Sequence, residues 1–364
     1  MSRVAFGSLI GHLRRTPLRR NLIGGLIGLA VVVLVLESVS PFRQGQFATM
    51  AYLGIAAGGL TVLTGLNGQL SLGHGALMAV GAYTAALLLH DVEKPLPLPV
   101  IMLLSVLVTV VVGAVVGVAA ARLHGPYLAG ATLAMAVAVP GISSFFGDTL
   151  GGEQGLSVPT PQAPGWFADA VYFLTAHDVT GSKYLAYIGW IGLIMSFVLL
   201  ANLSASRVGR AWRAVRDDEV AAEIAGINVG RARVKAFVVS AACAGLAGGV
   251  MAMLVRIAAP SGFTLGLSLS LLTAIVLGGL GSLVGALVGA ALLTFLPQTI
   301  TGLGQSLGLS DLQSAQLAPL VYGLTLVLVI LLAPAGLVGT IHTAWRRRQS
   351  SDLAPVHPQQ EAMQ

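Results

Sequence analysis

Apolar residues fill this chain in long stretches that short polar segments separate. A stretch of about 20 apolar residues, at a helical rise of 1.5 Å per residue, is long enough to cross a hydrocarbon core. Such stretches lie near residues 22–40, 47–66, 71–90, 98–121, 127–146, 184–203, 235–256 and 318–338. A further apolar region, 264–300, is too long for one span and short for two. The pattern predicts an all-α, polytopic membrane protein with about 8–10 transmembrane helices, some of them broken or re-entrant.

Composition supports a membrane protein. Of the 364 residues, 55% are hydrophobic and only 9% are charged, whereas about 25% of the residues in a soluble domain are charged. The net charge of +6 could suggest a nucleic-acid partner, but the arginines cluster beside apolar stretches, as they do on the cytoplasmic side of membrane proteins. The single cysteine, Cys243, excludes an intramolecular disulfide, and its apolar neighbours favour a buried, inert thiol.

The arginine clusters predict the topology. The basic N-terminal segment, 1–21, and the tail, 341–364, are both expected in the cytoplasm, so the transmembrane domain, 22–340, must cross an even number of times. The tail is polar and is expected to be disordered. Residues 147–183 are acidic and are expected outside, whereas 204–234 are rich in arginine and are expected inside. The even number of crossings then requires that residues 264–300 cross the membrane twice.

Two details complete this topology. The passes of 264–300 should turn near Gly278–Gly285, where the sequence GGLGSLVG predicts a re-entrant or short-helix hairpin. The N-terminus could also be a signal peptide with a small-x-small cleavage site at Ser38-Val39-Ser40. Because Pro41 follows directly and disfavours cleavage, an uncleaved first span is the preferred interpretation.

One polar segment lies between apolar spans. The stretch Thr64–Tyr83, TGLNGQLSLGHGALMAVGAY, has no formal charge, and its glycines and Ser resemble those of Gly278–Leu287. Interrupted helices at corresponding places in two halves indicate a substrate path near the midplane, because non-helical backbone at membrane depth must line a cavity or be buried. The candidate path residues here are Asn67, Gln69, Ser71 and His74. No second His or carboxylate stands near His74, so no metal site is expected.

Glycines in these two segments have a second interpretation, since small residues also permit close helix packing. It applies to Gly73, Gly75, Gly81, Gly285 and Gly289.

Missing residue types narrow the mechanism. Apart from edge positions such as Glu37, Lys235 and Arg256, the apolar stretches contain no charged residue, so no carboxylate proton relay is available. Sodium coupling through backbone carbonyls remains open, but a passive channel or an externally driven permease fits better. No lysine stands in a Gly-Lys-Ser/Thr nucleotide loop. No catalytic residue and no cofactor are therefore expected in this chain, and any ATP would be hydrolysed by partner subunits.

The arginine-rich loop, 204–234, contains a short predicted helix. Asp217 and Asp218 suit its N-terminus and Gly226 suits the position after its end. Glu219 and Glu223 lie one turn apart and form an acidic face. Because so short a helix is marginal alone, a partner surface is expected. The arginines before it could contact lipid headgroups or pair with these acids, for instance Arg213 with Asp217, and the alternative is a solvated charged loop.

These residues carry a family resemblance. The segment DDEVAAEIAGINVGRARVKAFVVSAACAGLAGGVMA resembles the cytoplasmic coupling loop of bacterial ABC importer permeases of the branched-chain amino acid, LivM-type family. The segments NGQLSLGHGALMAVGAYTAALL, LHGPYLAGATLAMAV, GGEQGL and VLGGLGSLVGALVGAALL resemble others of that family in the same order, so the resemblance covers roughly residues 45–340. One departure is that the broader Glu-Ala-Ala, Gly, Ile-x-Leu-Pro pattern is only half present, in Glu219–Gly226.

The resemblance implies a multi-pass subunit of the bacterial inner membrane. Its expected partners are a homologous second permease, two cytoplasmic ATPase subunits and an external substrate-binding protein that delivers leucine, isoleucine or valine. Asp217, Asp218, Glu219, Glu223 and Gly226 are then the expected ATPase coupling site. Tyr127 and Thr132 join the path residues, and Gly152, Glu153 and Gln154 are candidates for receptor contact unless their loop is merely solvated.

Two alternatives stay open. Within the same architecture, the cargo could be urea or a short amide. From another class, the chain could be a passive channel or a secondary carrier, in which case no ATPase should bind.

Overall fold

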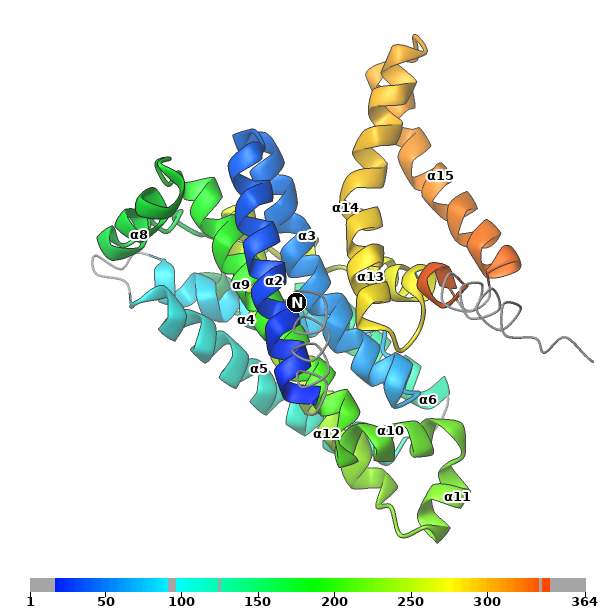
Figure 1. Cartoon of the computed structure of the whole chain (residues 1–364). Coiled ribbons are helices and arrows are strands. Elements are labelled where there is room, and N and C mark those ends of the chain that lie inside the picture. The colour runs from blue at the N-terminus through cyan, green and yellow to red at the C-terminus, as the bar shows by residue number, and fades with distance from the viewer. Residues whose placement is uncertain (1–16, 91–95, 124–125, 334–335, 341–364) are drawn as a thin grey trace, which may run out of the picture.

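A computed structural model of the chain describes residues 17–90, 96–123, 126–333 and 336–340. Most of the basic N-terminal segment and the predicted disordered tail lie outside these residues. Within them, nine helices are long and apolar enough to cross a membrane, and one shorter apolar helix spans His74–Leu89. The predicted all-α, polytopic fold is confirmed (Figure 1).

The first half of the chain forms the helices α2 Pro17–Ser38, α3 Pro41–Leu60, α4 His74–Leu89, α5 Leu98–Ala120 and α6 Pro126–Phe145, with a π-helix, η1, at Thr61–Leu66. The middle forms α7 Gly147–Leu150, α8 Gly165–Thr175, α9 Gly181–Ala205, α10 Arg207–Asp217, α11 Glu219–Ile224 and α12 Val229–Val255. The remainder forms the 3-10 helix η2 Pro260–Phe263, then α13 Leu265–Gly278, α14 Leu283–Ser306 and α15 Asp311–Leu332. Two short strands, β1 Leu156–Ser157 and β2 Ile257–Ala258, pair antiparallel.

Helix α12 lies at the centre and packs against α3, α4, α5 and α9. Small residues make this possible, because a Cβ on Gly81 of α4 would clash with the backbone of Gly245 on α12. Likewise, a Cβ on Gly289 would clash with the backbone of Ala274, where α14 packs on α13. A Cβ would also meet neighbouring atoms at the other glycines named above, so the packing interpretation is confirmed for Gly73, Gly75, Gly81, Gly285 and Gly289.

Several helix boundaries differ from the apolar pattern. Helix α3 begins at Pro41 and not near residue 47, because Pro suits the first helical position after the extended Ser40. Helix α15 begins at Asp311 and not near residue 318, because Ser310 and Gln313 form a capping box. Helix α14 continues through Pro297 to Ser306. The predicted turn of the 264–300 hairpin is confirmed, since α13 ends at Gly278 and α14 begins at Leu283.

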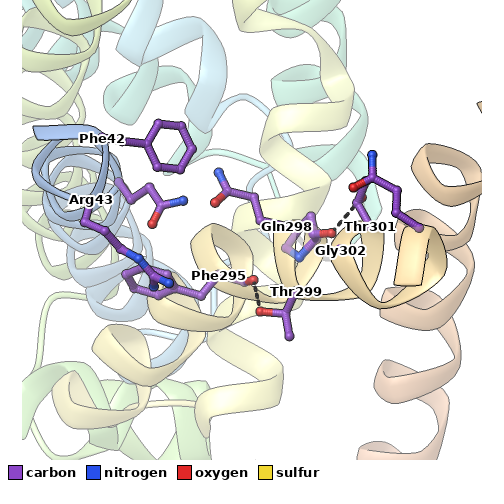
Figure 2. Close-up of a pocket in the computed structure, with 10 residues that line it drawn as sticks. Phe42, Arg43, Phe295, Gln298, Thr299, Thr301 and Gly302 are labelled. Atoms are coloured by element: carbon purple, nitrogen blue, oxygen red, sulfur yellow. Dashed lines mark hydrogen bonds between the residues drawn. The ribbon is translucent and has the colours of Figure 1, made fainter. Parts of the chain in front are cut away.

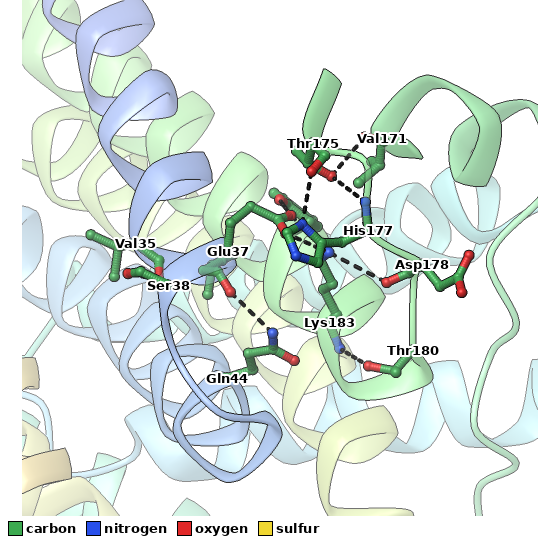
Figure 3. Close-up of polar contacts among 12 residues, drawn as sticks. Val35, Glu37, Ser38, Gln44, Val171, Thr175, His177, Asp178, Thr180 and Lys183 are labelled. Carbon is green, nitrogen blue, oxygen red and sulfur yellow. Dashed lines mark hydrogen bonds and ion pairs between the residues drawn. The ribbon is translucent and has the colours of Figure 1, made fainter. Parts of the chain in front are cut away.

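The bundle has two distinct ends. Helices α10 and α11 lie at one end, and the α2–α3 turn, α8 and the tip between α14 and α15 lie toward the other (Figure 1). At this second end, a polar cluster ties α2 to α9 (Figure 3). Lys183 Nζ lies 2.7 Å from Glu37 Oε1, and the Tyr187 hydroxyl donates to the same oxygen at 2.7 Å. His177 Nδ1 lies 3.4 Å from Glu37 Oε2. We call these four residues the Glu37 cluster.

Candidate functional site

The polar segment predicted to interrupt the bundle is non-helical. Helix α3 widens into η1, where Asn67 N–H donates to the Val62 carbonyl five residues back at 3.1 Å. Gly68 then takes a φ of +76°, a backbone conformation that favours glycine. Regular helix resumes only at His74. We call residues 67–73 the broken segment.

Hydrogen bonds from three elements hold the broken segment and the start of α4 in place. Leu72 N–H donates to Thr132 Oγ1 of α6 at 3.0 Å, and Gly75 N–H donates to Ser268 Oγ of α13 at 2.9 Å. The Thr64 hydroxyl donates to the Gln69 carbonyl at 3.0 Å. The predicted path residue Thr132 therefore also fixes the backbone of the segment.

The polar side chains of the broken segment are buried but unpaired. Asn67 is 3% exposed, Gln69 is 4% exposed and Ser71 is fully buried. Within the part of the chain that the structure describes, the amide atoms of Asn67 and Gln69 and the hydroxyl of Ser71 have no hydrogen-bond partner. Since buried polar groups are nearly always paired, these atoms are suited to a partner from outside the chain. Their lining of a path stays a prediction.

The remaining two predicted path residues, His74 and Tyr127, differ from each other in burial. His74 is fully buried, and its Nδ1 lies 3.4 Å from Ser240 Oγ of α12. Tyr127, on the first turn of α6, is 77% exposed and lies on the outside of this chain. The structure thus gathers Asn67, Gln69, Ser71, His74 and Thr132 around one break and leaves Tyr127 apart.

The two glycine-rich interruptions meet. Gly281, in the turn between α13 and α14, has a φ of +80°, and a Cβ on Gly65 would clash with its backbone. The sequence comparison predicted two similar interruptions but not their contact. Because both positions lack a side chain, the turn can rest directly on η1.

Arg216, at the end of α10, reaches this junction. Its Nη1 donates to the Gly65 carbonyl at 2.8 Å, and a Cβ on Gly68 would lie 2.9 Å from its side chain. Its Nη2 also donates to Asp217 Oδ1 at 2.8 Å. The suggested pair of Arg213 with Asp217 is wrong: Arg213 Nη1 donates to the Ser204 carbonyl at 3.0 Å instead, since Asp217 ends α10 beside the nearer Arg216.

Sequence reasoning missed α10. Ser206 caps it by accepting from Val208 N–H at 3.1 Å, and Trp212 fixes it to α12 by donating Nε1–H to the Ala232 carbonyl at 2.9 Å. The signal was present in the sequence, since Trp212 and Val215 are spaced three apart among the arginines, as on the apolar stripe of an amphipathic helix. Both side chains are buried.

The short helix α11 has the predicted cap at Asp218 and the predicted glycine after its end, but Asp217 is the last residue of α10 and not part of the α11 N-terminus. The Asp218 side chain accepts from Ala221 N–H at 3.0 Å, and Gly226 has a φ of +83°. Its acidic face is divided, because Glu219 forms an ion pair with Arg233 of α12 while Glu223 stays exposed. Ile224, 84% exposed, adds an apolar side chain beside Glu223. Exposed apolar side chains on a marginal helix indicate a partner surface.

The predicted receptor contact lies in a constrained turn. Gly151, Gly152 and Gly155 all have positive φ, and Ser143 Oγ donates to the Gly152 carbonyl at 2.7 Å. Glu153 and Gln154 are exposed at the tip. The turn exposes these side chains at its tip, and their contact with a receptor stays a prediction.

Comparisons with known proteins agree with this architecture. Residues 45–330 match a family described as the branched-chain amino acid transport system permease component. The high-affinity branched-chain amino acid transport system permease protein LivM of Salmonella typhimurium is 32% identical over 281 residues, 72% of this chain. LivM of Escherichia coli has the same identity and coverage, and this chain spans 66% of the length of each LivM protein.

More distant relatives resemble the chain along more of their own length. The permease BraD of Pseudomonas aeruginosa is 28% identical over 77% of this chain and 89% of its own. LivH of Escherichia coli is 25% identical over the same shares. No solved structure matches the chain.

Proposed function

The chain belongs to the family of branched-chain amino acid transport permease components, and from this premise we propose that it is one permease subunit of an ABC importer. It forms half of a translocation path together with a homologous second permease. The similarity to both LivM and LivH proteins supports such a pair. Two cytoplasmic ATPase subunits drive the transport, and an external binding protein delivers the amino acid. The chain itself holds no cofactor.

The observation that carries this proposal is the contact of Arg216 with Gly65. It joins the helix pair α10–α11 directly to the point where η1, the broken segment and the α13–α14 turn meet. A movement of α11 would pull on Arg216 and shift the backbone of both interruptions together. A channel or a stand-alone carrier has no need of such a connection to an exposed helix.

We place the ATPase on α11. Glu223, with the exposed Val220 and Ile224, forms the docking contact, and the Asp218 cap and Gly226 define the ends of the helix. Glu219 orients the helix through its ion pair with Arg233. Closure of the ATPase pair on ATP would push α11, rock α10 and open the path outward.

Topology follows from the positive-inside rule. The arginines of α10 put the α10–α11 end in the cytoplasm. The opposite end, with Glu153 and Gln154 at the tip of its turn, then faces the receptor. An amino acid released there would pass Asn67, Gln69, Ser71 and His74, whose polar atoms replace the water that it leaves behind.

The test is purification of the tagged chain from its host membranes in mild detergent, with mass spectrometry of what accompanies it. We expect an ATPase and a second permease, and leucine uptake by the reconstituted assembly when its receptor is added. Glu223→Arg should abolish the recovery of the ATPase, whereas Glu153→Gln, at the opposite end, should leave it unchanged. A solitary chain, under conditions that preserve a known importer complex, would contradict the proposal, and so would uptake of urea but not leucine.

A further inference from the structure

A cleft that none of the path residues lines opens between two helices. It lies between the first turns of α3 and the second half of α14 and has a volume of about 520 Å³, within the range of about 300–1,000 Å³ typical of small-molecule sites. Figure 2 shows Phe42 and Arg43 of α3 facing Phe295 and Gln298 of α14. We call it the α3–α14 cleft.

Among the residues that the structure describes, Arg43 is the single charged side chain that lines the cleft. Residues 17–90, 96–123, 126–333 and 336–340 offer it neither a hydrogen bond nor an ion pair. Asp311, near the rim, accepts from Gln305 Nε2 at 3.0 Å instead. The guanidinium is therefore available, and its planar fork matches a carboxylate in a bidentate geometry.

The cleft also offers hydrogen-bond acceptors. Gln46 lines it, is 7% exposed, and its Oε1 has no partner among the described residues. The hydroxyls of Thr299 and Thr301 donate to the carbonyls of Phe295 and Pro297 at 2.8 and 2.9 Å. A hydroxyl that has already donated its hydrogen can only accept. Such acceptors suit an ammonium group.

Apolar surface completes the lining. The rings of Phe42 and Phe295 and the ring of Pro297 form part of the same cleft. A ligand that carries a carboxylate, an ammonium and a small apolar side chain would find a matching group for each.

We propose that the α3–α14 cleft binds a free amino acid with an apolar side chain, with Arg43 holding its α-carboxylate. The inference rests on the proposed function and names the site that receives the cargo, at the end of the bundle opposite α10 and α11. It also distinguishes the two cargo classes, because urea has no carboxylate for Arg43 to bind.

The test measures protection of an introduced thiol in the co-purified assembly, held in phosphatidylcholine nanodiscs. Gly302→Cys adds a thiol in the lining, where a Cβ meets nothing within 4 Å. Gly165→Cys is the matched control, since its Cβ is equally free and lies outside the cleft. Both are made in a Cys243→Ala background and labelled with a water-soluble maleimide.

We expect leucine to slow labelling at position 302 and to leave position 165 unaffected. Leucinamide and urea, which lack the carboxylate, should give no protection. Arg43→Gln should raise the leucine concentration for half-protection by about tenfold or more, as expected for the loss of a charged hydrogen bond. Arg43→Lys should lose less than Arg43→Gln, because it keeps the charge but not the fork.

Three patterns of protection would overturn the inference, as would the absence of protection by leucine. They are equal protection by leucine and leucinamide, leucine protection that Arg43→Gln leaves unchanged, and protection by phosphatidylglycerol nanodiscs without leucine, which would assign the cleft to an anionic lipid headgroup. Leucine uptake without leucine protection would reject the cleft and leave the proposed function standing. Leucine protection in an assembly that couples no ATPase to uptake would support the cleft and reject the importer.

Discussion

The Glu37 cluster, at one end of the bundle, and the broken segment, inside it, are both polar, yet they differ in how their atoms are paired. In the Glu37 cluster, the carboxylate accepts from Lys183 and Tyr187 and lies beside His177. In the broken segment, the amides of Asn67 and Gln69 have no partner in the described chain. Paired polar groups hold helices together, whereas we propose that the unpaired groups of the broken segment bind something that arrives from outside.

The difference has a physical basis. A buried charge must be paired to be tolerated, so the 3% exposed Lys183 is fixed by its carboxylate. A buried neutral amide or hydroxyl without a partner costs less free energy than a buried unpaired charge. A path without charges also binds a zwitterion only weakly, so that the zwitterion can pass. We therefore expect that loss of a polar group lowers stability in the Glu37 cluster. In the broken segment, it should lower transport and leave stability unchanged.

The largest effect on stability is expected from Lys183→Met. It leaves the Glu37 carboxylate, 15% exposed, without its cation, and we expect the free energy of unfolding to fall by about 3 kcal/mol. Thermal unfolding in detergent measures this. The control is Lys235→Met, whose side chain is exposed and whose loss should change little. Equal effects of the two variants would contradict a structural role for the cluster.

Arg216→Gln should uncouple the two ends of the importer with a smaller loss of stability. Without the hydrogen bond to the Gly65 carbonyl, leucine uptake per ATP hydrolysed should fall about tenfold, the value of one charged hydrogen bond. Arg210→Gln removes an arginine of the same helix that only contacts the Ala205 carbonyl and should leave coupling intact. Identical coupling in both variants would remove Arg216 from the mechanism.

The smallest effect is expected at Thr132, which belongs to the paired side of the comparison. Thr132→Val removes the hydroxyl that accepts from Leu72 N–H and should cost about 1 kcal/mol of stability. Thr132→Ser keeps the hydroxyl and should restore most of this loss. The unfolding midpoints of the two variants are compared in the same detergent. A serine variant as unstable as the valine variant would show that the threonine methyl group contributes as much stability as the hydroxyl does.

Much of the fold could be predicted from the sequence because apolar length and capping residues act locally. The spans follow from runs of apolar residues, and Asp218 and Gly226 define α11 as expected. The broken segment was predictable because glycines and polar residues interrupt a span. Each of these signals needs only a short window of sequence.

Contacts between distant segments were not predictable. Nothing in the sequence says that Gly65 meets Gly281, since the pairing depends on how α13 and α14 pack. Arg216 looks like its neighbours, which recur every third residue, and only the orientation of α10 selects it. Arg43 did not stand out because the apolar run begins near residue 47, whereas Pro41 starts the helix earlier.

The most direct test of the central claim, that unpaired polar atoms of the broken segment line the path, is a paired measurement on Gln69→Met. The substitution keeps the shape of the side chain and removes an amide that has no internal partner. We expect an unchanged or higher unfolding midpoint together with leucine uptake reduced about tenfold in the reconstituted assembly. A lower midpoint with normal uptake per folded molecule would contradict the claim. Gln69 would then stabilise the fold, as the Glu37 cluster does.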